Sequence, residues 1–282
     1  MKQRIITAII GIAVLLLAIW KINTVIFVAA IALVCGFSSF ELLNAVNTKN
    51  KPLKFFSVIF AAAVPFLFGF EPIAKYNLLP AMSLVFLFVI SCIMLKDHRN
   101  IRVKMYFASV FGSFVLPLCF STIIRIGNPN PFMSSTYTYL QGIYLTVFAF
   151  CCSWLTDTFA YFVGSKFGKH KMCPKISPKK SVEGAVGGFV LSVIFNGAIY
   201  LLIDKFSFSL SAISFAGILI LSGVLSILSM IGDLTASVIK RDCSIKDFGN
   251  IMPGHGGMLD RFDSCIFVFP TLYIVLEFFN RF

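Results

Sequence analysis

Charged side chains gather in one stretch of this otherwise apolar chain, between Ile231 and Ser264. Five of the twelve acidic residues lie there: Asp233, Asp242, Asp247, Asp260 and Asp263. Lys240, Arg241, Lys246 and Arg261 lie among them, and His255 follows Pro253 and Gly254. Charged groups beside hydrocarbon are costly unless they are paired, hydrated or bound to a metal. Such a cluster therefore indicates a functional site.

The residue types in this stretch suit a metal-bound polyphosphate. Carboxylates are ligands for hard cations such as Mg²⁺, and Lys and Arg bind phosphate oxygens. Gly254, Gly256 and Gly257 let the backbone approach a ligand closely. The structural alternative is a network of ion pairs at a helix end, but five acids with four bases and a histidine favour a binding site.

A second group of polar residues lies upstream, in two parts. Asp157, Tyr161 and Gly164 recur at i, i+4 and i+7 and share one helix face. Asp157 either ties helices together or faces substrate, since an Asp inside a membrane helix avoids lipid. The segment Lys175–Gly184 follows, where Pro178 predicts a turn and Ser181 with Glu183 predicts a helix start that favours anions.

In the segment Lys175–Gly184, Lys179 and Lys180 are therefore placed to meet phosphates. The alternative is an ordinary basic loop at the membrane surface, which we prefer for Lys166, Lys169 and Lys171. Glu41 stands alone in an apolar segment. It makes either a helix–helix hydrogen bond or part of a cavity wall.

The composition places these residues in a membrane protein. Of the 282 residues 58% are hydrophobic and only 13% are charged, and the mean hydropathy is +0.91. That charged share is about half of what soluble proteins carry. The net charge of +12 does not indicate nucleic acid, because the bases sit in short loops, where they orient helices and meet anionic lipid.

We expect an all-α bundle of about nine transmembrane helices, because backbone polar groups in lipid must be satisfied internally. The apolar segments lie near 5–20, 24–46, 55–70, 78–95, 106–124, 139–163, 185–203, 210–231 and 264–279. Nineteen of the 24 Lys and Arg residues fall on the side of the N-terminus. Excess Lys and Arg marks the cytoplasmic side, which predicts a cytoplasmic N-terminus and an external C-terminus.

We expect one membrane-embedded domain over 1–282, with N-terminal helices in 1–138 and catalytic helices in 139–282. Cytoplasmic loops are expected at 164–184 and 232–263. If the eighth helix continues past the membrane, Asp233, Ser237, Lys240 and Arg241 lie on roughly one face. Asp260 and Asp263 are three residues apart and also share a face. Two helix ends bearing carboxylates, joined by a glycine-rich loop, can hold cations.

The pattern S-x-x-K-R-x4-K-D-x-G-x3-P-G-H-G-G-x2-D-R-x-D, from Ser237 to Asp263, resembles the signature of the phosphatidate cytidylyltransferase (CDP-diacylglycerol synthase) family. The block S-P-K-K-S-x-E-G, from Ser177, resembles a second motif of that family. The resemblance implies transfer of CMP from CTP to phosphatidate, giving CDP-diacylglycerol and pyrophosphate for phospholipid synthesis. A lipid phosphate oxygen attacks the α-phosphorus in line, with Mg²⁺ bridging phosphate oxygens.

The resemblance implies a role for each residue of the two motifs. Asp233 and Asp260 are expected as metal ligands, and Asp247 and Asp263 as ligands or their supports. Lys240, Arg241, Lys246 and Arg261 are expected to bind the phosphates and the leaving pyrophosphate. Ser177, Lys179, Lys180, Glu183, Ser237 and Asp157 are expected to bind CTP or the lipid head group. Gly254, Gly256 and Gly257 supply backbone amides or close approach, and His255 binds phosphate or moves a proton.

The resemblance also implies the setting of the reaction. We expect a multi-pass protein of the inner membrane with its site facing the cytoplasm. The implied partners are CTP, phosphatidate, the bilayer and a second copy of the chain in a homodimer, with no nucleic acid. The resemblance leaves open a second cation beside Mg²⁺.

Three other functions compete with this one. A related enzyme could use an ether lipid or a polyprenyl phosphate, which apolar tails do not distinguish. A CDP-alcohol phosphatidyltransferase is disfavoured because its motif is absent from the sequence. A transporter or channel would spread its charges along a midplane pathway, whereas these charges pool in two loops on one side.

Overall fold

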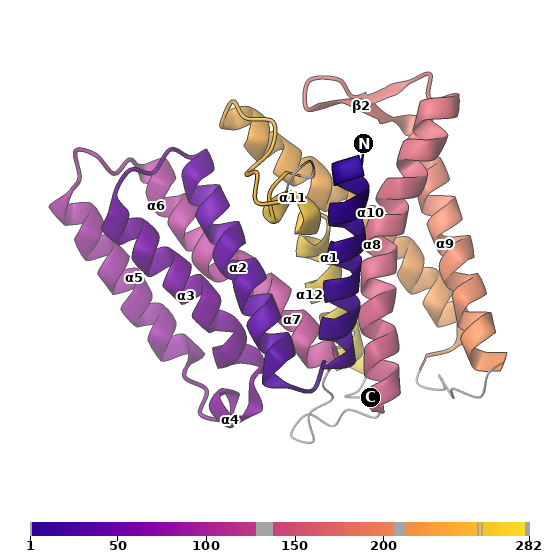
Figure 1. The fold of residues 1–282 in the computed structure, drawn as a ribbon, viewed down its shortest axis with the longest axis horizontal. Helices are drawn as coiled ribbons and strands as arrows, with labels where there is room; N and C mark the ends of the chain where they lie inside the picture. Colours follow the sequence, from indigo (N-terminus) through magenta and orange to yellow (C-terminus); the bar gives the residue numbers. More distant parts are fainter. Residues whose placement is uncertain (1, 128–137, 206–212, 253, 255, 280–282) are drawn as a thin grey trace. The chain divides into compact units, whose positions relative to one another are not determined.

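The computed structural model of the chain describes residues 2–127, 138–205, 213–252, 254 and 256–279, and helices make up most of them (Figure 1). This confirms the predicted fold class, a polytopic helical membrane protein. The helices are α1 (Lys2–Trp20), α2 (Val25–Ala45), α3 (Lys51–Gly69), α4 (Glu71–Ala74), α5 (Leu79–Lys96), α6 (Val103–Val110), the π-helical turn η1 (Phe111–Val115), α7 (Leu116–Gly127), α8 (Tyr139–Phe167), α9 (Val182–Lys205), α10 (Phe215–Asp242), α11 (Leu259–Phe262) and α12 (Cys265–Phe279). Two short strands, β1 (Lys171–Cys173) and β2 (Ser177–Ser181), lie between α8 and α9.

Seven helical segments of the described residues are long and apolar enough to cross a membrane. They are α2, α3, α5, the continuous segment Val103–Gly127, α8, α9 and α10. Two shorter apolar stretches, Ile10–Trp20 and Cys265–Phe278, coincide with the first and last predicted segments. The count of nine spans and the orientation of the termini stay predictions.

The chain forms two compact units, and the charged stretch contributes to both. Unit 1 contains Met1–Arg125 and Asp242–Phe262, and unit 2 contains Ile126–Arg241 and Asp263–Phe282. The chain therefore passes from unit 2 into unit 1 after Arg241 and returns to unit 2 after Phe262.

The core of unit 1 is built by α3, α5 and the start of α6, which lie side by side in Figure 1. The rings of Phe60 and Phe86 stack with centroids 4.2 Å apart. Leu53, Ile90 and Ile101 are buried around them. The side chain of Asn50 accepts the N–H of Leu53 at 2.8 Å and caps α3. Burial of this apolar face fixes the ends of α3 and α5.

The turn η1 interrupts the long segment between α6 and α7. Pro117 follows it by two residues, and a proline ring clashes with the carbonyl four residues back, here that of Ser113. A wider turn relieves that clash. Ser113 and Ser39 of α2 lie within hydrogen-bond distance, 3.3 Å between their hydroxyl oxygens, so the widened turn still packs against a neighbour.

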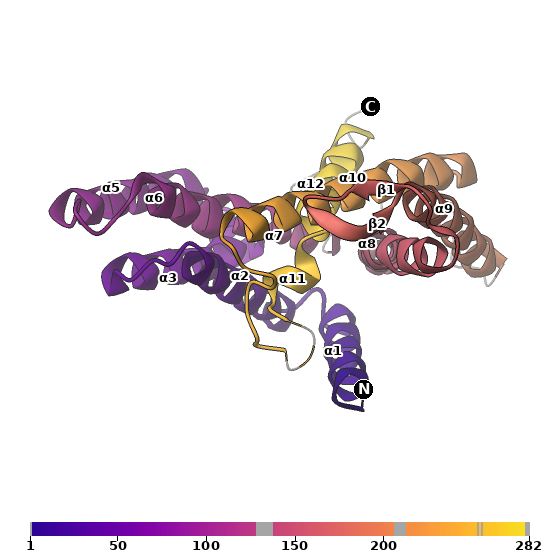
Figure 2. The same cartoon turned by 90° about the horizontal axis from the view of Figure 1, so that it is seen from above.

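Unit 2 is held together by close helix contacts between α8 and α9, which run side by side in Figure 2. A Cβ at Gly188 would lie 2.7 Å from the carbonyl oxygen of Thr156. Thr156 donates to Ser226 of α10 at 3.0 Å, and Ser226 donates to Ser192 of α9 at 3.2 Å. Small residues and hydroxyl hydrogen bonds are the usual means of joining helices in lipid.

Strands β1 and β2 form an antiparallel hairpin at the end of the α8–α9 pair (Figures 1 and 2). Pro178 lies within β2, so the predicted turn at this proline is wrong. A two-stranded sheet consists only of edge strands, and an edge strand tolerates the missing N–H of proline. Ser181 ends β2, and its hydroxyl accepts the N–H of Gly184 at 3.1 Å. The predicted helix start at Ser181 is therefore confirmed.

Candidate functional site

A cavity of about 580 Å³ in unit 2 brings together several of the residues singled out in the sequence. It lies among the ends of α8 and α9, the hairpin and α10. Its lining includes Asp157, Tyr161, Gly164, Ser177, Lys179, Lys180 and Asp233. Carboxylates and ammonium groups therefore border one cavity beside apolar helices.

Asp233 has two polar neighbours at this cavity. Its carboxylate pairs with the ammonium of Lys180 at 2.5 Å, and both side chains are about a quarter exposed. Ser237, one turn later on α10, donates to the other carboxylate oxygen at 3.4 Å. The helix α10 runs to Asp242, so the condition stated for this shared face is met and the first residues of the expected loop 232–263 are helical instead. The continuation places Asp233 and Ser237 on the same face.

Asp263 lies between α11 and α12 and is deeply buried. Lys240 of α10 lies 3.5 Å from its carboxylate, and their side chains are only 12% and 7% exposed. The other carboxylate oxygen of Asp263 accepts the N–H of Ser264 at 2.8 Å. The hydroxyl of Ser264 donates to Asp157 at 2.7 Å. Asp157, Lys240 and Asp263 are thus linked through α8, α10 and the start of α12.

The surroundings of Asp263 disfavour its negative charge. Burial raises the pKa of this carboxyl to about 7, and the charge of Asp233 adds to the rise. Lys240 lowers the pKa, Asp157 raises it, and the hydrogen bond from Ser264 lowers it. Burial is the largest cause of this rise in the pKa, and the neighbouring carboxylates of Asp233 and Asp157 add to it.

The hairpin contributes one further contact to α10. The guanidinium of Arg241 donates through Nε to the carbonyl of Ile176 at 3.1 Å. This bond fixes the turn before Ser177, while Lys179 stays exposed at the cavity. Arg241 therefore has a positioning contact, besides the phosphate role predicted for it.

Glu183 does not line this cavity. Its carboxylate lies 2.6 Å from the ring of His170 and accepts the backbone N–H groups of Lys169 and His170 at 3.1 Å. It therefore fastens the beginning of the hairpin to the beginning of α9. These contacts position the backbone, and the substrate binding predicted for Glu183 stays a prediction.

The rest of the charged stretch belongs to unit 1, where Asp260 organises the glycine-rich loop. One oxygen of its carboxylate accepts the N–H of Phe248 at 2.7 Å and that of Gly257 at 3.0 Å. Gly256 has φ of +89°, a backbone conformation that side chains rarely adopt. A Cβ there would meet Asp260 at 3.1 Å and Asp247 at 3.6 Å. The carboxylate of Asp260 and the Cβ of Asp247 therefore border the same glycine.

Glu41 of α2 holds the same loop and is 2% exposed. It accepts the N–H groups of Met258 and Leu259, each at 2.9 Å. A Cβ at Gly249 or Gly257 would collide with its carboxylate. The sequence alone left Glu41 between a helix–helix bond and a cavity wall. Its isolation in an apolar helix was a signal, but its partners lie more than 200 residues away.

Other predicted residues of this loop lie at the surface of unit 1. Lys246, Asp247 and Arg261 are exposed, as binding of a soluble nucleotide requires. Gly254 has φ of +78°, a backbone conformation that residues other than glycine rarely adopt. Pro253 and His255 lie outside the described residues, so the role of His255 stays a prediction.

The donor chemistry of these residues fits a hard divalent cation. Within the described ranges, no three His, Cys, Asp or Glu side chains are grouped as a metal site. Mg²⁺ is usually bound by only one or two carboxylates, with waters and substrate phosphates completing its shell. Asp233 and Asp263 in unit 2, or Asp247 and Asp260 in unit 1, suffice for such a site. Binding of Mg²⁺ by these carboxylates stays a prediction.

Comparison with known proteins decides the family. The model of the cytidylyltransferase family matches residues 2–279. The chain belongs to the cytidylyltransferase family. The similar proteins in this family include one of Thermotoga maritima, named phosphatidate cytidylyltransferase. It is 32% identical over 98% of this chain and 96% of its own length.

Two further relatives of this cytidylyltransferase carry the same name. The protein of Bacillus subtilis is 32% identical over 99% of both chains. The protein of Staphylococcus saprophyticus is 44% identical over 158 residues, which is 56% of this chain and 58% of its own. The resemblance drawn from the two motifs is thus confirmed. The chain is a membrane-embedded nucleotidyltransferase.

Proposed function

We propose that this cytidylyltransferase transfers CMP from CTP to phosphatidate, giving CDP-diacylglycerol and pyrophosphate. The names of its full-length relatives support this choice. The observation that carries it is the cavity where Lys180 pairs with Asp233 beside Lys179 and Asp157. Ammonium groups for phosphates and carboxylates for a cation are the parts that nucleotidyl transfer needs.

The reaction requires positioning and charge neutralisation more than covalent chemistry. A phosphate oxygen of phosphatidate forms a bond to the α-phosphorus of CTP. The bond from that phosphorus to the β-phosphate oxygen breaks, and pyrophosphate leaves with the electron pair. A phosphate monoester is already a nucleophile at neutral pH, so no residue has to remove a proton first.

The basic residues of the site bind the phosphates in this proposal. Lys179 and Lys180 hold a substrate phosphate at the cavity. Lys240 and Arg241 follow on α10, Lys246 lies on the loop of unit 1, and Arg261 lies on α11. Preorganised cations of this kind stabilise the charge that develops on the leaving pyrophosphate.

The acidic residues hold Mg²⁺, by the same proposal. Asp233 and Asp260 would be its ligands, and Asp247 and Asp263 would ligate it or support those two. Mg²⁺ supplies neutralisation of the phosphate oxygens, which otherwise repel the incoming lipid phosphate. The ammonium of Lys180 pairs with the carboxylate of Asp233, so a cation bound by Asp233 would leave the Lys180 ammonium available to a substrate phosphate.

The substrates place the reaction at a membrane surface. CTP is soluble, and phosphatidate has its phosphate in the headgroup layer. The excess of Lys and Arg on the side of the two motifs supports a site that faces the cytoplasm. We therefore propose an inner-membrane enzyme, acting as a homodimer as the family resemblance implies.

Purified protein with labelled CTP tests the proposal. The lipid phosphates to compare are phosphatidate, an ether analogue and a polyprenyl phosphate, with Mg²⁺ present or chelated. We expect CDP-diacylglycerol and pyrophosphate in equal amounts, only with phosphatidate, CTP and Mg²⁺ together. A preference for the ether lipid or the polyprenyl phosphate would show that this lipid, and not phosphatidate, is the substrate. Lipid or ion uptake without consumption of CTP would favour a transporter.

A further inference from the structure

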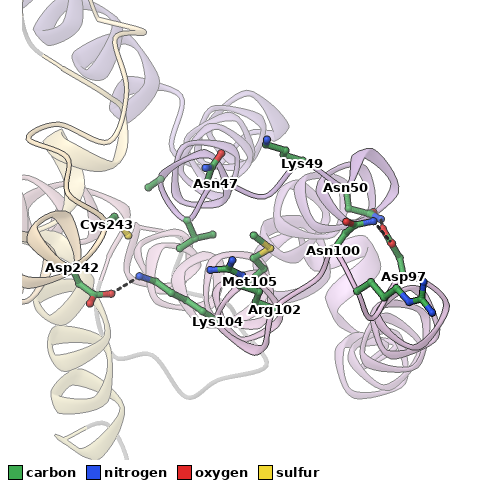
Figure 3. Close-up of a pocket in the computed structure, with 13 residues that line it drawn as sticks. Asn47, Lys49, Asn50, Asp97, Asn100, Arg102, Lys104, Met105, Asp242 and Cys243 are labelled. Carbon is green, nitrogen blue, oxygen red and sulfur yellow. Dashed lines mark hydrogen bonds and ion pairs between the residues drawn. The ribbon is translucent and has the colours of Figure 1, made fainter.

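A second polar cavity lies in unit 1, lined by residues other than those around Lys180 and Asp233. It measures about 730 Å³ and is drawn in Figure 3. It lies where α2 ends, α3 begins, α5 ends and α6 begins, with Asp242 and Cys243 on one side. These are the ends of apolar helices, so the cavity lies at the level of the lipid headgroups.

The two carboxylates of this cavity are already satisfied. Asp97 accepts the amides of Asn50 and Asn100, each at 2.7 Å. Asp242 pairs with Lys104 at 2.5 Å, and dashed lines in Figure 3 mark these contacts of Asp97 with Asn50 and of Asp242 with Lys104. Among the residues that the structure describes, neither Asp97 nor Asp242 forms an ion pair with any other basic residue that lines this cavity.

Three further bases line the cavity, namely Lys49, Arg99 and Arg102. All three are exposed. In the described part of the chain, none of them has a carboxylate within ion-pair distance. Three like charges around one hollow repel one another, and a bound anion relieves that repulsion. Arginine binds phosphate through two parallel hydrogen bonds.

We propose that this cavity binds the phosphate group of an anionic phospholipid. The same phosphate chemistry exists in soluble nucleotides, but among the described residues no aromatic ring lines the cavity to stack a base. Its position at helix ends fits a headgroup that stays attached to its chains in the bilayer. The site adjoins Asp242, where α10 passes into the glycine-rich loop. A lipid bound there fixes the point where that loop begins.

Native mass spectrometry of the protein in neutral detergent tests this site. The probe is phosphatidylglycerol, whose phosphodiester has no terminal phosphate to react with CTP. Phosphatidylcholine serves as the zwitterionic comparison. Binding is measured without turnover, so failure of the proposed reaction leaves the result readable.

The test variant is Lys49→Gln/Arg99→Gln/Arg102→Gln, and we expect it to bind phosphatidylglycerol at least about tenfold more weakly than the unchanged protein. That factor corresponds to about 1.4 kcal/mol, close to the lower end of the range for one hydrogen bond to a charged group. The matched control Lys166→Gln/Lys169→Gln/Lys175→Gln removes the same charge from exposed residues that line neither cavity. It should bind as the unchanged protein does.

Single substitutions refine the test. Arg102→Gln should weaken binding, whereas Lys96→Gln, which is nearby but outside the lining, should not. Equal binding by the triple variant and the unchanged protein would overturn the proposal. If the triple variant lost binding of CTP or inorganic phosphate but still bound phosphatidylglycerol, the proposal would also be overturned and the cavity would be assigned to a soluble anion. All these positions are exposed, so an unchanged melting temperature is expected.

Discussion

The carboxylate of Glu41 accepts the backbone N–H of Met258 at 2.9 Å, across 217 residues of chain. It binds the N–H of Leu259 at the same distance. These N–H groups belong to the beginning of α11, where helical N–H groups lack partners within the helix. A residue of α2 thus fixes the backbone just before Asp260.

Glu41→Gln tests this positioning role. The amide keeps one acceptor oxygen and turns an NH₂ group toward a donor, so one of the two hydrogen bonds is lost. We expect about a tenfold or greater loss of kcat, with a smaller change in the KM for CTP. Steady-state CMP transfer by the purified protein measures both.

Ser38→Ala is the matched control for Glu41→Gln. Ser38 lies one turn earlier on α2, and its buried hydroxyl has no hydrogen-bond partner in the described part of the chain. Activity near that of the unchanged protein is expected. If Glu41→Gln behaved like Ser38→Ala, the loop would not depend on Glu41.

Gly257→Ala should disturb the same loop from the other side. An added Cβ would collide with the carboxylate of Glu41, and relief of this overlap must move the loop or α2. We expect a loss of transfer activity of at least about tenfold and a lower melting temperature, since overpacking of this kind costs about 1–3 kcal/mol. Gly11→Ala, with nothing within 4 Å of the new Cβ, should change neither. Unchanged activity of Gly257→Ala would contradict the close contact between the Glu41 carboxylate and Gly257.

Much of this architecture could be predicted from the sequence. Each apolar segment contains a helix. The spacing of Asp233 and Ser237 indicated a shared face if the helix continued, and α10 does continue to Asp242. The helix start at Ser181 could be predicted from the residues that follow it. These features depend on local patterns of polarity and hydrogen bonding, which short stretches of sequence carry.

Other features could not be predicted because they depend on distant partners. Pro178 indicated a turn, but pairing with β1 holds it in a strand. The partner of Glu41 is chosen by how α2 packs against a loop far along the chain. The hydrogen bonds that Glu183 accepts from the backbone of Lys169 and His170 are visible only in the fold.

Lys180→Gln tests the basic side of the cavity. The substitution removes the partner of Asp233 and one ammonium from the phosphate site. We expect a loss of about 10²-fold or more in kcat/KM, the size typical for removal of one preorganised donor. Lys175→Gln, an exposed residue of the same hairpin that does not line the cavity, should keep its activity. Equal activity of the two variants would exclude Lys180 from the site.

Gly188→Ala tests the packing that supports the cavity. The new Cβ would lie 2.7 Å from the carbonyl of Thr156 and 2.8 Å from the Cβ of Ala160. We expect α8 and α9 to separate and the melting temperature in detergent to fall, again by an amount that corresponds to about 1–3 kcal/mol. Gly217→Ala on α10 meets only side-chain atoms, so its melting temperature should stay close to that of the unchanged protein. A normal melting temperature for Gly188→Ala would contradict the close contact.

The most direct test of the proposed metal site is the Mg²⁺ dependence of CMP transfer to phosphatidate by Asp233→Asn and Asp260→Asn. Each substitution removes a carboxylate charge with little change in shape. We predict that the unchanged protein and the control Asp204→Asn, an exposed residue at the end of α9, require Mg²⁺ and turn over normally. Both test variants should lose at least about 10²-fold in rate at every Mg²⁺ concentration. Near-normal turnover by either one, in protein that still inserts into the membrane, would contradict a cation held by these aspartates.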